Sequence, residues 1–143
     1  MVTDEILDGT RIGRLFSSEV HGHERGALGR LGVTEADPDV EAAEGGAFAF
    51  AVALDDGGDG DAGDLTGVER RIAEAYVHPD RLRIEFLVEA KTAAEAGATA
   101  GLRVRPKAVE PPRTLVFVER AADAKAGLRV VRDVAKAVLD DVG

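Results

Sequence analysis

The chain has 143 residues, a length that favours one domain, and it contains no cysteine. Disulfide bonds, thiolate nucleophiles and cysteine-bound zinc are therefore excluded. No stretch approaches the roughly 18 consecutive apolar residues of a membrane-spanning helix, so we expect no membrane association. The first five residues include two acids and no base, unlike a secretory signal, and the cytoplasm is the expected location.

The net charge of −9 is concentrated in one part of the chain. Residues 34–69 contain eleven acidic residues and no basic one, whereas residues 1–33 and 70–143 carry net charges of −1 and +3. Of the 18 basic residues, 14 are arginine and four are lysine. This acidic, lysine-poor composition is typical of proteins from organisms that accumulate salt, in which a high net charge maintains solubility. We therefore expect a halophilic protein.

The first part of the predicted single domain, residues 1–143, has little regular structure. Residues 1–33 predict short helical turns, the second of them capped by Thr10, and then an irregular lead-in interrupted by glycines. Residues 47–54 alternate large apolar side chains with alanine, so Phe48 and Phe50 are predicted to share one face of a central strand. Residues 55–66 are rich in aspartate and glycine but lack the spacing of a calcium-binding EF-hand, and we predict an acidic, mobile loop.

Residues 68–90 predict two antiparallel strands joined by a type I turn, with Pro79 at its second position. The register that follows opposes small and large side chains on the core face: Val77 with Leu82, Ala75 with Ile84, and Ala73 with Phe86. On the other face it pairs Tyr76 with Arg83, Ile72 with Leu87, and Glu74 with Glu85. Two carboxylates directly opposite each other repel, so we expect the last pair to be exposed.

The remaining chain predicts a second set of strands and helices. Residues 91–98 are rich in alanine and favour a helix. Residues 102–108 alternate apolar and basic side chains, and because Pro106 cannot donate a backbone hydrogen bond, this strand is an edge or ends there. Residues 114–118 predict a buried strand, and residues 124–141 an amphipathic helix. The order is one strand followed by two strand–strand–helix units. We therefore predict an α+β fold, a two-layer sandwich of a mostly antiparallel sheet with the C-terminal helix packed on one face.

The three histidines suggest a metal site as one hypothesis. His21 and His23 form an H-x-H pair, and His78 is predicted at the tip of the hairpin. Three imidazoles with one open position are a known arrangement for catalytic zinc. However, the pair lies among glycines, where no strand holds both rings in register. Exposed loop histidines are therefore the favoured interpretation, and metal binding or a metal hydrolase is the alternative. We predict no other cofactor.

Four basic residues suggest a second candidate site. Arg103, Arg105, Lys107 and Arg113 lie on one predicted strand face and the turn that follows, with alternate residues about 7 Å apart. Such a row can bind an anionic ligand or nucleic acid, or it can pair with acidic neighbours on a solvated face. Aromatic residues for base stacking are missing nearby, and salt weakens phosphate contacts. Nucleic acid is therefore not the favoured partner.

No established catalytic motif is present in the sequence. The nucleophile elbow, the phosphate-binding loop and the dinucleotide-binding glycine pattern are all absent, and the chain has two serines. A non-catalytic module for protein interaction or self-association is the favoured function, with a second copy or another protein as the partner. The expected contact is a sheet edge or an apolar, uncovered face formed by Ile72, Tyr76, Arg83 and Leu87, because tyrosine and arginine are enriched in interfaces.

Overall fold

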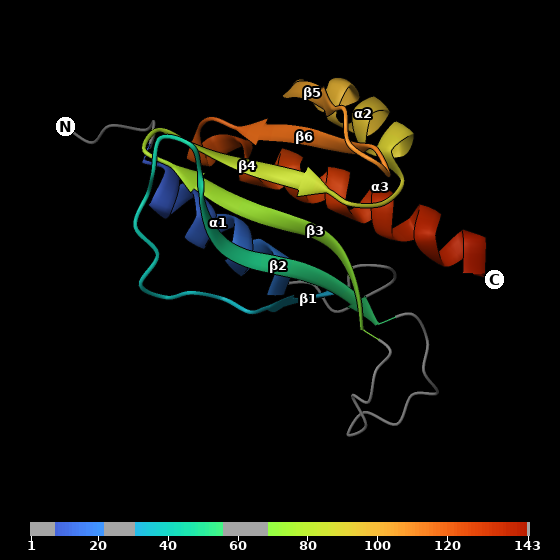
Figure 1. Ribbon diagram of the computed structural model, residues 1–143, viewed down its shortest axis with the longest axis horizontal. Coiled ribbons are helices and arrows are strands. Elements are labelled where there is room, and N and C mark those ends of the chain that lie inside the picture. The colour runs from blue at the N-terminus through green and yellow to red at the C-terminus, as the bar shows by residue number, and fades with distance from the viewer. Residues whose placement is uncertain (1–7, 22–30, 56–68, 143) are drawn as a thin grey trace.

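The computed structural model describes residues 8–21, 31–55 and 69–142 of the chain. Within these residues six strands form one antiparallel sheet in the order β1-β2-β3-β4-β6-β5 (Figure 1). The elements in chain order are α1 Gly9–His21, β1 Leu31–Thr34, β2 Ala47–Asp55, β3 Glu69–His78, β4 Arg81–Phe86, α2 Ala90–Thr99, β5 Arg103–Lys107, β6 Arg113–Val118, the 3₁₀ turn Ala121–Asp123 and α3 Ala124–Val142.

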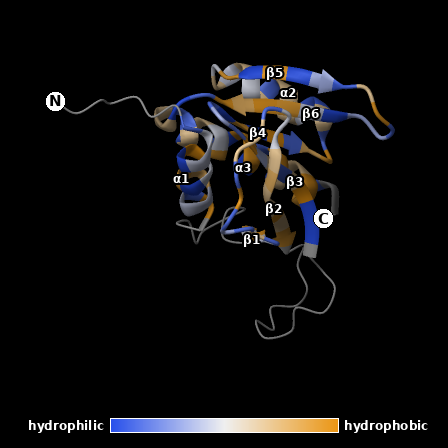
Figure 2. Ribbon diagram, turned by 60° about the vertical axis from the view of Figure 1, so that its left-hand side comes forward, coloured by the Kyte–Doolittle hydropathy of each residue, from blue (hydrophilic) through white to orange (hydrophobic). Residues whose placement is uncertain are grey.

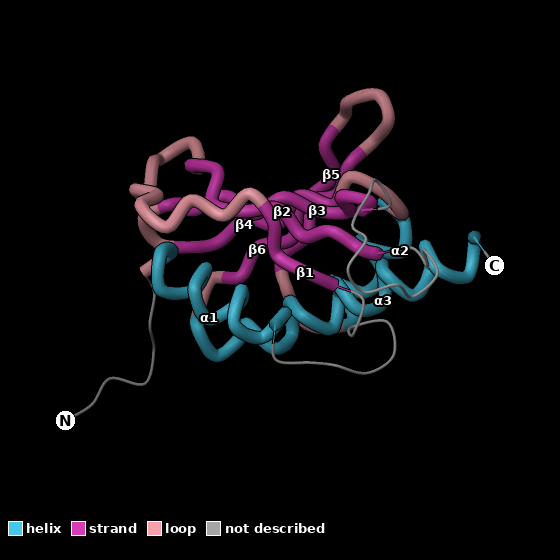
Figure 3. Tube along the Cα trace, turned by 90° about the horizontal axis from the view of Figure 1, so that it is seen from below, coloured by secondary structure: helices cyan, strands magenta, loops and turns pink. Residues whose placement is uncertain are grey.

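The helices α1, α2 and α3 all lie on the same side of the sheet (Figure 3). The predicted α+β sandwich, with a helix layer and a sheet layer, is therefore confirmed. Apolar residues of α1 and α3 form the core with the sheet: Phe16 stacks on Phe50 of β2 at 6.3 Å between ring centroids, and both rings are buried. None of the helices within the described residues is long and apolar enough to cross a membrane.

The hairpin of β3 and β4 has the predicted register. Ala73 pairs with Phe86, Glu74 with Glu85, Ala75 with Ile84, Tyr76 with Arg83, and Val77 with Leu82. The strand β5 lies at the edge of the sheet, as its proline indicated, and Figure 2 shows it as largely hydrophilic. Local alternation of side chains thus predicted these elements correctly, because one face of each strand is buried.

Ile72 lies in the core because of a bulge in β3, so its predicted position on the same face as Tyr76 is wrong. The pairing of β2 with β3 shifts between Val52 and Ala53, which leaves one additional residue in β3. A bulge reverses the alternation of side chains beyond it. Ile72 is consequently fully buried in the core and does not share a face with Tyr76.

The register of β2 with β3 also shifts between Phe48 and Phe50, so the prediction that these two rings share a face is wrong. Phe50 points into the core, whereas Phe48 lies on the other side of the sheet and contacts the ring of Tyr76 edge-to-face at 5.8 Å. The strand itself lies between β1 and β3, in agreement with the prediction that it is not an edge.

The N-terminal region is more regular than predicted. α1 is a single helix, and in its first turn the N–H of Thr10 bonds to Oδ1 of Asp8 at 2.9 Å. Asp8 therefore caps the helix, and the prediction of Thr10 in this role is wrong. Residues 31–33, predicted to be irregular, belong to β1, which pairs with β2. The predicted helical turn before residue 8 and the acidic loop after residue 55 lie outside the described residues.

Candidate interaction face

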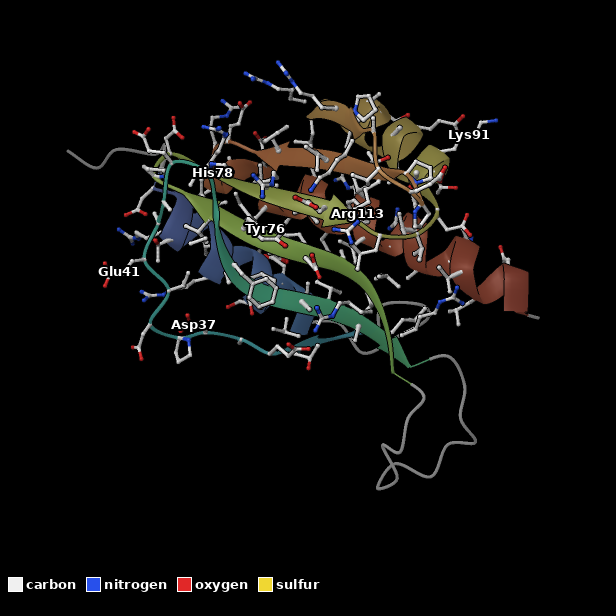
Figure 4. All side chains as sticks on the ribbon, viewed as in Figure 1. Asp37, Glu41, Tyr76, His78, Lys91 and Arg113 are labelled. Atoms are coloured by element: carbon white, nitrogen blue, oxygen red, sulfur yellow. The ribbon has the colours of Figure 1, made fainter. Side chains whose placement is uncertain are left out.

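The face of the sheet opposite the helices is called the open face here, because no described helix covers it (Figure 3). Figure 4 is viewed toward this face and shows Tyr76 and Arg113 on it, with the helices behind the sheet. The strand registers assign to it the residues Phe48, Glu74, Tyr76, Arg83, Glu85, Arg103, Arg105, Lys107, Arg113, Leu115 and Phe117. The face is therefore charged and aromatic, and the expectation of an apolar second face is wrong.

A buried carboxylate lies in the middle of the open face. The side chain of Glu85 is only 3 % exposed and contacts three cations: Arg83 at 3.1 Å, Lys107 at 3.2 Å and Arg113 at 3.2 Å. The prediction that the Glu74–Glu85 pair is exposed is therefore wrong. The two carboxylates tolerate each other because Lys107 of β5 and Arg113 of β6 add positive charge to that of Arg71 and Arg83 in the hairpin.

Glu74 is stabilised as an anion by its own set of donors. Its carboxylate accepts hydrogen bonds from Arg71 at 2.9 Å and from the hydroxyl of Tyr76 at 2.8 Å, and Arg113 lies 3.7 Å away. Burial alone would raise the pKa of Glu74, but these hydrogen bonds and positive charges outweigh it and hold the pKa below its usual value. Burial and the bond to Glu74 raise the pKa of Tyr76 to about 12, so the phenol stays protonated and donates.

Arg83 connects the strands to the segment before β2. Its guanidinium lies 4.5 Å from the ring centroid of Tyr76 and forms an ion pair with Glu85 on one side. On the other side it donates to the carbonyl oxygen of Gly45 at 3.2 Å and to Nε2 of His78 at 3.1 Å. Its Nε is buried and has no hydrogen-bond partner. Arg83 is therefore held rigidly by contacts in three directions.

His78 is buried, contrary to the expectation of an exposed loop histidine. Only 3 % of the residue is exposed, because residues 44–46 cover it. Nδ1 lies 2.9 Å from the carbonyl oxygen of Glu44, and because Nε2 accepts from Arg83, Nδ1 carries the proton and donates. Burial lowers the pKa of His78 below its usual value, and the charges of Arg81 and Arg83 add to this against the opposing effect of the Glu44 carbonyl.

Acid is expected to destabilise the chain through His78. Because the folded-state pKa is depressed, the unfolded chain takes up this proton first when the pH falls below 6.5. The contribution is fully present above that pH and is lost as the pH falls towards the folded-state pKa. Urea unfolding at about pH 8 and about pH 5.5 should show a larger loss of stability for the wild type than for His78→Gln. An identical loss in both proteins would contradict this assignment.

Only part of the predicted metal site lies within the described residues. Both ring nitrogens of His78 are engaged, so a metal would have to displace one of these bonds. His21 ends α1, but its side chain and all of His23 lie outside the described residues. No cluster of three or more potential metal ligands occurs among the residues that the structure describes. The metal hypothesis stays a prediction.

The predicted basic row lies on one face, but its members differ in their surroundings. Lys107 and Arg113 contact the buried Glu85, and Arg103 forms an exposed ion pair with Glu119 at 3.0 Å. Arg105 is exposed and has no ion pair with any residue that the structure describes. Lys107 and Arg113 therefore neutralise the buried Glu85, whereas Arg103 and Arg105 are exposed to solvent.

One row of side chains crosses the open face from β2 to β5, and sequence reasoning found only part of it. Successive cross-strand pairs give the order Phe48, Tyr76, Arg83, Phe117, Arg103, which we call the aromatic row. Of the predicted interface residues, Tyr76 and Arg83 lie at its centre, Leu87 follows β4 and is partly buried, and Ile72 is in the core. Phe48 and Phe117 were missed because their place in the row depends on a bulge and on the pairing of β4 with β6.

These features define a class of protein: an antiparallel α+β sandwich with helices on one face and an ordered, charged and aromatic open face on the other. The chain belongs to a family of unknown function, DUF7993, whose model matches residues 1–143. Comparison with curated proteins and with solved structures found no match.

Proposed function

We propose that this protein is a cytoplasmic, non-catalytic interaction module of a salt-adapted cell, and that it binds a protein partner through its open face. The observation that carries the proposal is the aromatic row on a sheet face that no described helix covers. Tyrosine and arginine dominate the binding energy of protein interfaces, and the row places them at the centre of the sheet. The acidic composition supports the salt-adapted setting.

The rigidity of the row favours binding. Arg83 is stacked on Tyr76, and the phenol of Tyr76 is bonded to Glu74, so their side chains are ordered before a partner arrives. Ordering side chains on association costs roughly 0.5–1.5 kcal/mol for each flexible one, and preordered groups avoid much of this loss. The same contacts leave Phe48 and Tyr76 only partly buried.

Binding of a small anion is a second candidate function. It is favoured by the exposed guanidinium of Arg105, which has no ion pair among the described residues, and by the exposed pair of Arg103 with Glu119, which an anion can replace. It is weakened by the commitment of Lys107 and Arg113 to Glu85, because these two charges are already compensated. We therefore rank it below a protein partner.

The absence of cysteine permits a direct test of the open face by thiol labelling. Arg105→Cys places a thiol on the open face, and Arg129→Cys places one on the exposed side of α3 with the same change of charge. In an extract of the cells that make the protein, we expect Arg105→Cys to react several-fold more slowly than in dilute purified form. Arg129→Cys should react equally fast in both. Equal rates for Arg105→Cys in extract and dilute buffer would overturn the proposed function.

A further inference from the structure

The open face is divided into two flanks of opposite charge. β3 and β4 are the middle strands of the six, with β1 and β2 on one side and β6 and β5 on the other. The contact of Tyr76 with Arg83 lies on this midline. Each flank therefore extends over a similar width from the same central pair.

The flank beside β2 is acidic. The segment between β1 and β2 starts beside β2, where the N–H of Asp37 bonds to the carbonyl of Ala49 at 2.8 Å. It then reaches β3, where the N–H of Ala43 bonds to the carbonyl of Val77 at 3.3 Å. It contains five exposed acids and no base, which we call the acidic strip: Glu35, Asp37, Asp39, Glu41 and Glu44. Figure 4 shows Asp37 and Glu41 at this margin of the sheet. Asp39, Glu41 and Glu44 form no ion pair within the described part of the chain.

The flank formed by β5 is basic. Arg103 and Arg105 project from the open face with exposed side chains, and we call them the basic pair. Arg103 belongs to the same row as Phe48 and Arg83, and Arg83 contacts Gly45 at the end of the acidic strip. The first part of the acidic strip, beside β2, and the basic pair are therefore on opposite sides of the midline, whereas the end of the strip, at Glu44, lies beside His78 of β3.

We propose that the partner of the open face is a second copy of this chain, related by a two-fold axis that runs parallel to the strands between β3 and β4. This rotation exchanges the two margins and keeps the height along the strands. It therefore places the acidic strip of each copy against the basic pair of the other, twice in one dimer. Stacked sheets lie about 10 Å apart, a distance that side chains from both faces can fill.

The same axis matches the aromatic row with itself. Tyr76 of one copy lies opposite Arg83 of the other, because the two residues are equally far from the midline. Phe48 faces the position of Phe117, whose side chain is buried beside Arg81, so Tyr76 and Arg83 supply the central contact. Arginine over tyrosine is a favourable contact. A self-complementary surface is what a two-fold interface requires. This inference rests on the proposed function and specifies its partner.

Variants that reverse the charge of the basic pair or of the acidic strip test the proposed two-fold dimer. One variant carries Arg103→Glu and Arg105→Glu, and a second carries Asp39→Arg and Glu41→Arg. Sedimentation at a salt concentration that keeps the chain folded should show a dimer for the wild type. Each variant alone brings like charges together twice and should dissociate at least about a hundredfold more readily. An equimolar mixture should form a dimer again, because both contacts are then between opposite charges.

A control variant with Arg129→Glu and Arg132→Glu has the same charge change as the first variant but on α3, and it should dimerise like the wild type. A monomeric wild type, a dimer that survives either reversal, or a mixture that stays monomeric would each overturn the two-fold arrangement. If the wild type is monomeric while Arg105→Cys is still protected in cell extract, the open face binds another protein, and only the inference about the second copy fails.

Discussion

Replacing Glu85 by alanine is expected to lower the free energy of unfolding by about 3 kcal/mol, the lower end for breaking a buried ion pair. The variant leaves Arg83, Lys107 and Arg113 facing one another without the carboxylate that contacts all three. Lys107 and Arg113 are 40 % and 34 % exposed, so water compensates part of the loss, which keeps the expected value at that lower end. Urea unfolding monitored by circular dichroism measures the change.

Two further variants complete the test: one separates charge from shape at position 85, and the other is a surface control. Glu85→Gln keeps the size and one acceptor oxygen and should lose less stability than the alanine variant. Glu95→Gln removes an exposed carboxylate from α2 and should change stability by less than about 0.5 kcal/mol, as surface substitutions usually do. If Glu85→Ala is as stable as Glu95→Gln, the contacts of Glu85 do not stabilise the fold.

Gly9→Ala is expected to destabilise the chain by about 3 kcal/mol, the upper part of the usual range for overpacking. α1 begins at Gly9, directly against the turn between β3 and β4, where its N–H bonds to the carbonyl of Pro79 at 3.3 Å. A methyl group at this position would overlap the backbone carbonyl oxygens of His78 and Arg81. Backbone atoms of a tight turn cannot move aside as a flexible side chain does, so the helix would have to shift.

Gly13 provides the matched control within the same helix. A methyl group there would meet Leu82 and Val77 at 3.5 Å, which is ordinary van der Waals contact. Gly13→Ala is therefore expected to stabilise the chain by about 0.4–1 kcal/mol, because alanine loses less conformational entropy in a helix. Thermal unfolding of both variants measures opposite shifts in Tm. Shifts of the same sign and size would contradict the close approach at Gly9.

Glu85→Ala is expected to affect the two proposed binding modes, a second copy and a small anion, differently. Glu85→Ala should free Lys107 and Arg113 from their buried partner and so make the open face more basic. That change strengthens binding of an anion, whereas it leaves the acidic strip and the basic pair of the dimer in place. The ion cluster around the buried Glu85 therefore stabilises the open face. The exposed acidic strip and the basic pair recognise the partner.

The order of the elements from β2 onward and the register of the central hairpin were predicted from the sequence because both depend on neighbouring residues. The turn at Pro79 determines which residues of β3 and β4 face each other, and alternation determines which of them are buried. The edge position of β5 followed from Pro106, and the amphipathic spacing of α3 predicted a helix on the sheet. These are short-range properties of the chain.

The candidate site depended on contacts between distant residues, which local patterns do not contain. Glu85 is buried because Lys107 and Arg113, 22 and 28 residues away, neutralise it, and His78 is buried because Glu44, 34 residues away, covers it. The bulges in β2 and β3 moved Phe48 onto the open face and Ile72 into the core. A sequence records which side chains are apolar, whereas strand pairing decides which charges meet. The sequence by itself therefore determined the layers of this protein, and only the tertiary structure decided the chemistry of its open face.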